Sequence, residues 1–270
     1  MNFSISNLSW NCKDEEMYPI LQNNNVKNIE ISLTKQFGDW GSIKEKNLIK
    51  YKNSLKERGF NISSVQSIFY QKDYNLFKKT PVFIEHFKKV LDYCELLDCK
   101  YVVFGSPKIR NPYDLSCEEA EKIFIEVFNQ ISDYSKEVII GIETNPKIYG
   151  CKYITDYKKC KQILRKINKQ NIKFHLDTAC VYLEGDDPVS IFSKEKNNLN
   201  HIHLSCKNLQ TIYNDRIVND IVKIAASNSL NSCLSVEMLK ISKEEINLIF
   251  QELNNIFELY RTKTGDSHDK

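Results

Sequence analysis

Short apolar runs alternate along the chain with longer stretches whose apolar residues fall at helical spacing. The short runs are typical of buried strands, and they cover residues 3–8, 26–33, 62–68, 101–105, 138–143, 172–177, 201–205 and 234–238. Between two of them, Phe83, Phe87, Val90, Leu91 and Cys94 repeat with the period of a helix that is buried along one face. The pattern therefore predicts strands and helices in alternation.

Capping patterns mark where some of these helices begin. Ser116 and Ser242 are each followed within one turn by two glutamates, an arrangement that satisfies free backbone amides at a helix start. The last helix is expected to run from about Ser242 to Tyr260. The polar residues 262–270 after it are predicted to be a flexible C-terminal tail.

Eight predicted strands, each followed by a helix, fit the usual size of a (β/α)₈ TIM barrel, which is roughly 250 residues. The other α/β architecture that we considered, an open doubly wound sheet, usually has a glycine-rich turn after its first strand. Residues 7–10, Asn-Leu-Ser-Trp, are no such turn. Because no linker or change of composition divides the chain, we expect a single barrel domain over residues 1–261.

The composition says more about the partners of the protein than about its fold. The 270 residues are 41% hydrophobic and 27% charged, with a net charge of +3, and most lysines are interleaved with acidic residues. A nucleic-acid partner is therefore not expected, since it requires basic residues gathered on one face. No apolar run is long enough to span a membrane, and the first residues do not form a signal peptide. Nine scattered cysteines without close pairs favour a reduced, cytoplasmic setting.

The last four predicted strands are apolar on one face and small or polar on the other. The polar positions include Glu143, His175, Asp177, His201, His203, Ser205 and Glu237. Successive side chains of a strand point to opposite faces, and the outer face of a parallel barrel must be apolar because helices cover it. The polar positions are therefore expected to point into the barrel.

Glu143, Asp177, His203 and Glu237 each lie at or near the C-terminal end of their predicted strand, where the active sites of these barrels form. Buried carboxylates that converge need an opposite charge, and a divalent cation supplies it. The alternative is that each residue pairs separately with Lys, Arg or a backbone amide. Four residues at matching positions on consecutive strands make this alternative less favoured. Three carboxylates and one imidazole suit one metal ion, with Mn²⁺ first and Mg²⁺, Co²⁺ or Zn²⁺ as alternatives.

The segments IETNP, HLDTAC, HIHLS and SVEM contain these four residues, in this order along the chain. Their order and spacing resemble the xylose isomerase-like sugar phosphate isomerase and epimerase barrels, over essentially residues 1–260. The resemblance implies a carbohydrate substrate and a divalent metal held by the four residues. It also implies proton abstraction beside a carbonyl through an enediolate, with Glu143 and Glu237 as the catalytic pair. Two copies of such a barrel commonly pair, so a homodimer is also implied.

The chain departs from this family in two places. Cys180 stands where many members have a histidine, three residues after the aspartate of the sixth strand. Several epimerases also have an arginine downstream of the seventh-strand histidine, where this chain has only Lys207 and Leu209 nearby. These departures concern substrate contacts, so the identity of the sugar is left open.

Further candidates come from the same end of the barrel. The predicted substrate contacts are Glu30, Gln66, Lys108, Arg110, Asn145 and Tyr149. Lys108 and Arg110 would hold a phosphate or another anionic group. His175 and His201 lie two residues deeper than the metal ligands and are expected either to orient them or to be hydrogen-bonded core residues. Aromatic residues in predicted loops could pack against a sugar, although core packing is their commoner role; these are Trp10, Phe37, Trp40, Phe69 and Tyr70.

Three other functions use a similar barrel. An endonuclease IV-type nuclease needs three zinc ions and more histidines than this chain has, because only five are present and His86 and His268 fall in a predicted helix and in the tail. A dehydratase acting on a cyclic polyol ketone shares the proton abstraction. A barrel that binds a sugar without turnover is the third possibility.

Overall fold

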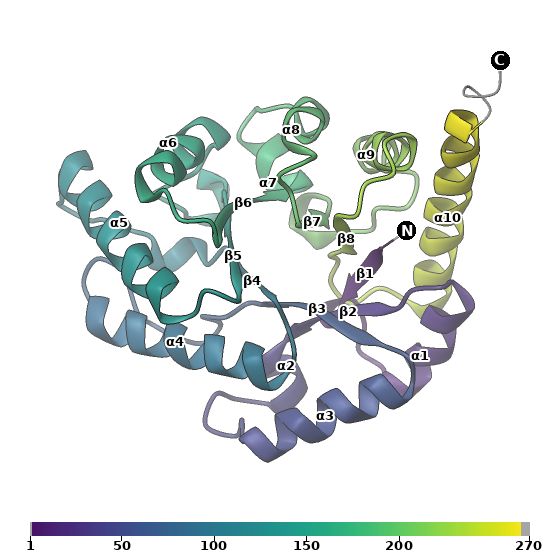
Figure 1. Cartoon of the computed structure of the whole chain (residues 1–270), viewed down its shortest axis with the longest axis horizontal. Coiled ribbons are helices and arrows are strands. Elements are labelled where there is room, and N and C mark those ends of the chain that lie inside the picture. Colours follow the sequence, from purple (N-terminus) through teal and green to yellow (C-terminus); the bar gives the residue numbers. More distant parts are fainter. Residues whose placement is uncertain (1, 266–270) are drawn as a thin grey trace.

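The computed structural model describes residues 2–265, with side chains through residue 261. Eight parallel strands close into a barrel in chain order, and helices surround it (Figure 1). The first strand pairs with both the second and the last. The strands are β1 (Phe3–Ser6), β2 (Asn28–Ser32), β3 (Asn61–Gln66), β4 (Tyr101–Phe104), β5 (Ile139–Glu143), β6 (Ile172–Asp177), β7 (His201–Leu204) and β8 (Cys233–Val236). The predicted single-domain TIM barrel is confirmed.

Helices follow the strands and cover the outside of the barrel, which is the arrangement that the alternating pattern predicted (Figure 1). They are α1 (Asp14–Asn23), α2 (Leu33–Phe37), α3 (Glu45–Glu57), α4 (Thr80–Leu96), α5 (Cys117–Tyr134), α6 (Tyr157–Ile167), α7 (Thr178–Leu183), α8 (Pro188–Glu195), α9 (Arg216–Ser227) and α10 (Lys243–Gly265). The apolar face predicted from Phe83 to Cys94 is fully buried along α4. None of the helices within residues 2–265 is long and apolar enough to cross a membrane.

Both predicted helix caps are present. Ser116 forms a reciprocal capping box with Glu119 at the start of α5. The Ser242 hydroxyl accepts a hydrogen bond of 3.1 Å from the backbone amide of Glu245, just before α10. Helix α10 continues to Gly265, beyond the end predicted near Tyr260. The helix therefore takes in the first part of the predicted flexible tail, and residues 266–270 lie outside the described residues.

Several strands are shorter than predicted because the chain turns as soon as it leaves the barrel. Strand β1 ends at Ser6 and continues into a 3-10 turn, Asn7–Ser9, while β2 passes directly into α2. Strand β8 ends at Val236, so Glu237 is the first residue after it. These boundaries leave the polar ends of the strands at one mouth of the barrel.

The barrel interior below this mouth is filled by aromatic and imidazole rings. The Tyr101 hydroxyl lies 3.2 Å from His175 Nδ1, and the Tyr101 ring stacks on His201 with centroids 5.1 Å apart. A Cβ at Gly141 would lie 2.8 Å from two carbons of the Tyr101 ring. Only glycine at that position leaves room for the tyrosine. His175 and His201 are thus packed core residues, as one of their two predicted roles required.

Candidate metal centre

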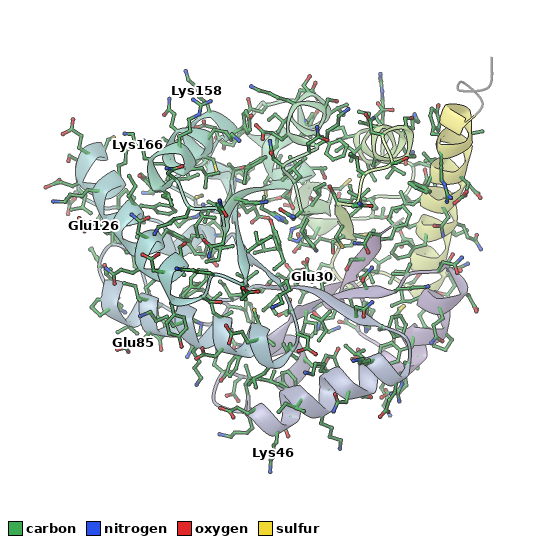
Figure 2. All side chains as sticks on the ribbon, viewed as in Figure 1. Glu30, Lys46, Glu85, Glu126, Lys158 and Lys166 are labelled. Atoms are coloured by element: carbon green, nitrogen blue, oxygen red, sulfur yellow. The ribbon has the colours of Figure 1, made fainter. Side chains whose placement is uncertain are left out.

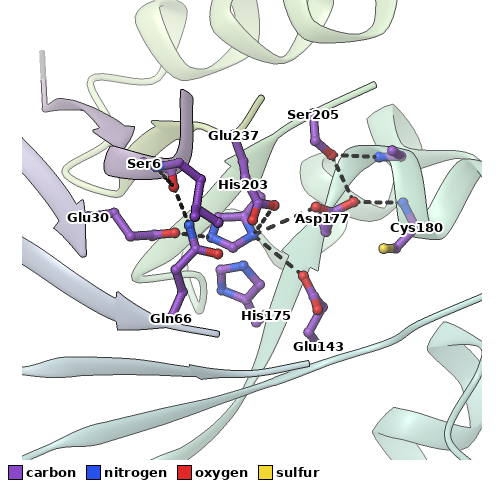
Figure 3. Close-up of polar contacts among 12 residues, drawn as sticks. Ser6, Glu30, Gln66, Glu143, His175, Asp177, Cys180, His203, Ser205 and Glu237 are labelled. Atoms are coloured by element: carbon purple, nitrogen blue, oxygen red, sulfur yellow. Dashed lines mark hydrogen bonds and ion pairs between the residues drawn. The ribbon is translucent and has the colours of Figure 1, made fainter. Parts of the chain in front are cut away.

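Four side chains converge on one point at the mouth of the barrel (Figure 3). Nδ1 of His203 lies 3.1 Å from Glu237 Oε2, 3.4 Å from Glu143 Oε1 and 3.6 Å from Asp177 Oδ2. One potential ligand atom from each residue lies within 4.8 Å of the others. The strand parity that placed these four residues together is therefore correct in its geometry.

Neighbouring groups hold the oxygens of two carboxylates that do not face His203. Asp177 Oδ1 accepts hydrogen bonds from the Cys180 backbone amide at 2.6 Å and from the Ser205 hydroxyl at 2.9 Å. Glu143 Oε2 accepts one from the Asn145 amide at 2.7 Å. Each carboxylate thus keeps its other oxygen turned toward the common point. Such outer hydrogen bonds fix the direction in which a ligand presents its lone pair.

Glu30 holds the other nitrogen of His203. Its Oε1 lies 2.8 Å from His203 Nε2, and its Oε2 lies 3.0 Å from His201 Nε2 and accepts a short hydrogen bond from Ser64. The side chain has no exposed surface and lies at the centre of the molecule (Figure 2). A carboxylate that accepts a hydrogen bond from Nε2–H keeps the proton on that nitrogen, which leaves the Nδ1 lone pair free for a metal.

This position of Glu30 corrects the prediction that it contacts the substrate. Glu30 was expected at the end of its strand, but β2 continues to Ser32 and a register shift toward β3 occurs beside Glu30. Glu30 does not line the cavity at the mouth. It acts on His203 instead.

The charges of this cluster change several pKa values strongly. Burial lowers the pKa of His203, but the carboxylates of Glu237 and Glu30 outweigh burial and raise it well above its ordinary value. Burial would raise the pKa of Glu30, yet His203 and His201 hold it well below its usual range. Burial, together with Asp177 and Glu143, raises the pKa of Glu237 to about 7. The excess of carboxylates therefore draws positive charge to this point.

The residues present fit a divalent cation. His203 Nδ1 is buried and makes no hydrogen bond, although three carboxylates surround it. Within the described part of the chain, none of the four side chains forms an ion pair with Lys or Arg, and of the three carboxylates only Asp177 accepts a hydrogen bond from a backbone amide, so separate pairing does not account for the cluster. Three oxygen ligands and one nitrogen ligand are a donor set for Mn²⁺, Mg²⁺, Co²⁺ or Zn²⁺.

A second group of potential ligands, His175, His201 and His203, lies deeper in the barrel. Glu30 and Ser64 already contact Nε2 of His201, and neither His175 nor His201 lines the cavity at the mouth. The four-residue group at the mouth is therefore the candidate metal centre.

Two residues after β4 support Glu143 and were not recognised from the sequence in this role. Arg110 is fully buried, and its Nη1 donates a hydrogen bond of 2.9 Å to the backbone oxygen of Glu143. This corrects its predicted role in binding an anionic group, because Arg110 lines neither the cavity beside the four residues nor the one next to it and is directed to the backbone of Glu143 instead. A Cβ at Gly105 would collide with the Glu143 carboxylate, with its Cδ only 3.2 Å away.

The four residues border a cavity of about 330 Å³, which is the size of a small ligand pocket. Of the predicted substrate contacts, Gln66, Asn145 and Tyr149 line this cavity, while Lys108 lines a neighbouring one. The Gln66 amide donates to Ser6, and the Tyr149 hydroxyl accepts from the Asn208 amide at 3.0 Å. None of the predicted aromatic residues lines the metal cavity. Cys180 and Leu209 do form part of its wall.

Solved structures with the same fold have different activities. An L-ribulose 3-epimerase superposes with a TM-score of 0.75 and 12% identity, covering 100% of this chain and 98% of the other. A probable 3-DHS dehydratase, AsbF from Bacillus anthracis, gives 0.71 and 14%, covering 94% and 99%. A family 2 AP endonuclease from Brucella melitensis gives 0.72 and 16%, covering 92% and 97%. At these identities the likeness shows the fold alone.

Sequence comparison places the chain in a family. No curated protein matches it. The family model described as xylose isomerase-like TIM barrel matches residues 21–215, which is more than half of the chain and includes three of the four candidate metal ligands. The barrel, the site at its mouth and this match agree with the resemblance seen in the sequence. The chain belongs to the xylose isomerase-like TIM barrel family.

Proposed function

We propose that this protein is a divalent-metal-dependent isomerase or epimerase that acts on a sugar or sugar phosphate. One observation carries the proposal: the carboxylates of Glu143 and Glu237 approach His203 from different strands, within a cavity sized for one small molecule. Two acid–base groups flanking a substrate are what proton removal and return beside a carbonyl require. The structural neighbours include an epimerase of this size, which supports the choice.

Glu143, Asp177, His203 and Glu237 would hold the metal, for which we propose Mn²⁺. A cation bound there supplies Lewis-acid stabilisation of the negative charge that develops on the substrate oxygens. Asn145, Ser205 and the Cys180 amide keep the carboxylates in place. Glu30 keeps His203 in the orientation that presents Nδ1.

We assign the two proton transfers to Glu143 and Glu237. One carboxylate takes the proton from the carbon beside the carbonyl, which leaves an enediolate, and the other returns a proton to the opposite face of the same carbon. These two steps invert the configuration of that carbon, which is an epimerisation. Return to the adjacent carbon instead exchanges an aldose and a ketose.

Gln66, Asn145 and Tyr149 line the same cavity, and we propose that they contact the sugar hydroxyls. Asn145 has a second role, because its amide already donates to Glu143. A substrate hydroxyl bound by Asn145 is therefore placed beside the acid–base group. The homodimer implied by the family resemblance stays a prediction.

Exchange of substrate hydrogen for solvent deuterium tests the proposal. With Mn²⁺ present and a panel of ketoses, the unmutated protein is expected to incorporate deuterium beside the carbonyl. Glu143→Gln and Glu237→Gln should each slow this exchange by about 10²–10⁴-fold, the usual contribution of a general acid or base. Glu126→Gln, at an exposed position on α5, is the control and should exchange at the unmutated rate (Figure 2).

Absence of exchange from every sugar in the unmutated, metal-loaded protein would contradict the proposal and favour a barrel that binds without turnover. A dehydratase would also exchange the hydrogen, since it begins with the same proton abstraction, but its product would have lost water. Mass analysis of the product therefore separates the two reactions. Metal analysis should find about one equivalent per chain, because one ligand set is available.

A further inference from the structure

A second cavity adjoins the metal cavity and shares part of its wall. It has a volume of about 630 Å³ and is lined by the loop that follows β3 and the loop that follows β4. Ser67, Ser106 and Pro107 line both cavities. The two cavities are therefore direct neighbours at these three residues.

The loops that form this cavity are held in a defined conformation. The Tyr70 amide donates to the Ser67 oxygen at 2.9 Å, and the Trp40 indole donates to the Tyr70 oxygen at 2.7 Å. The Leu76 amide donates to the Ile109 oxygen at 3.0 Å and so connects the two loops. The cavity is thus part of the folded structure, with walls that hydrogen bonds fix on both sides.

The shared wall also has unusual backbone geometry. Ser67 and Ser106 have φ values of 55° and 50°, in the left-handed region that residues other than glycine rarely adopt. Both serines line both cavities.

The side chains around the second cavity give it a positive charge. Lys72 and Lys108 line it, and neither forms an ion pair with any described residue. Its single carboxylate, that of Asp73, is bound by Lys79 at 2.7 Å. Lys72 also borders a separate hollow beside Glu85, so Lys108 is expected to contribute more. The Lys72 ammonium group lies over the Tyr74 ring, 5.2 Å from its centroid, and no described carboxylate neutralises either lysine, so the cavity favours an anionic ligand.

We propose that the second cavity binds the phosphate of the substrate, so that the substrate class is a phosphorylated sugar rather than a free one. This inference rests on the proposed function, because it assumes that the sugar itself lies at the metal centre. Lys108 and Lys72 provide charge-assisted hydrogen bonds to the phosphate oxygens. The exposed ring of Tyr70, 60% accessible at the rim, lies beside them.

Calorimetric titration of the full chain with D-fructose, D-fructose 6-phosphate and inorganic phosphate tests this proposal without requiring turnover. The phosphorylated sugar should bind at least about tenfold more tightly than the free sugar, as expected for hydrogen bonds to a charged group. Lys108→Gln should remove most of that preference, and Lys72→Gln combined with it should remove the rest. Lys158→Gln, an exposed lysine on α6 outside both cavities, is the matched control and should keep it (Figure 2).

Equal binding of the two sugars would overturn the proposal, and so would a preference that survives in the double variant or is lost equally in Lys158→Gln. Inorganic phosphate should compete with the phosphorylated sugar, and failure to compete would count against the site. The proposed function would fail in a different experiment: no deuterium would exchange into any sugar, whichever sugar the protein prefers to bind. The two ideas can thus fail separately.

Discussion

The two halves of the barrel contribute differently to the metal centre. Strands β5 to β8 supply every candidate ligand, each from the last position of a strand or close to it. Strands β1 to β4 supply none, but they provide the groups that hold the ligands: Glu30 behind His203, Arg110 behind Glu143, and Gly105, which leaves room for the Glu143 carboxylate. The second half thus presents the ligands and holds two of them through Asn145, Cys180 and Ser205, while the first half adds support to His203 and Glu143. A ligand set is therefore an incomplete description of this site.

Loss of a ligand from the second half should have the largest effect. Asp177→Asn replaces a charged ligand by a neutral one, while Oδ1 can still accept its two hydrogen bonds. The dissociation constant for Mn²⁺ should rise by more than about 100-fold, which is the upper end of what an outer residue causes. Titration of the metal-free protein with Mn²⁺ measures this constant. A smaller rise than the one caused by Glu30→Gln would contradict the assignment of Asp177 as a ligand and Glu30 as a supporting residue.

Loss of support from the first half should have a smaller but clear effect on the same quantity. Glu30→Gln removes the charge that faces His203 Nε2, so His203 is less firmly fixed with Nδ1 toward the metal. The dissociation constant should rise by about 10–100-fold. Glu85→Gln, an exposed glutamate on α4, is the control. Unchanged affinity in Glu30→Gln would show that the first half is a passive scaffold.

Gly105→Ala tests the space that the first half leaves for Glu143. The added methyl group would force the carboxylate to shift or to lose its bond from Asn145. We expect kcat for deuterium exchange to fall about tenfold or more, since small displacements of a reacting group are costly. Gly41→Ala, whose methyl would meet only the exposed Asp39 side chain, should exchange normally. A variant of Gly105 with full activity would contradict the steric argument.

The smallest effect concerns His86, a buried histidine of the first half whose imidazole forms no ion pair with any described carboxylate. His86 Nε2 lies 2.7 Å from the Ile68 oxygen, and burial, with Lys72 and Lys89, lowers its pKa below 6.5. As the pH falls below 6.5, the unfolded chain takes up a proton that the folded chain does not, so the free energy of unfolding decreases.

His86→Gln should make this decrease shallower by at most the slope of one proton, about 1.4 kcal/mol per pH unit. Urea unfolding at about pH 7.5 and about pH 5.5 measures the change. Some decrease should remain, because burial also lowers the pKa values of His175 and His201. An identical pH dependence in the variant and the unmutated protein would exclude this role for His86.

Much of this arrangement could be predicted from the sequence because it follows from local rules. Strand periodicity placed Glu143, Asp177 and His203 on the inner face, and chain order placed them at the same mouth. The contact between Glu30 and His203 joins β2 to β7, which are not neighbours in the sheet. Whether the two side chains meet depends on the height of each residue along the barrel axis. A register shift beside Glu30 changes the height of that residue relative to β3. No pattern within one strand encodes it.

The burial of Arg110 could not be predicted for a related reason. Its sequence neighbours, Ser106 to Lys108, are partly exposed, so the segment reads as a surface loop. The 3-10 turn Pro107–Ile109 reverses the chain and directs Arg110 inward to the backbone of Glu143. A basic residue in a loop is usually solvated, and only the tertiary structure shows that this one is not.

The pairing of β1 with β8 has a consequence for folding. This is where the two ends of the chain meet to close the ring. The four candidate ligands all come from the β8 side of that pairing, and the contact between Glu30 on β2 and His203 on β7 reaches across it. Opening the ring there would take Glu30 away from His203 and weaken the hold on the ion, so binding of the ion would in turn make that opening less frequent.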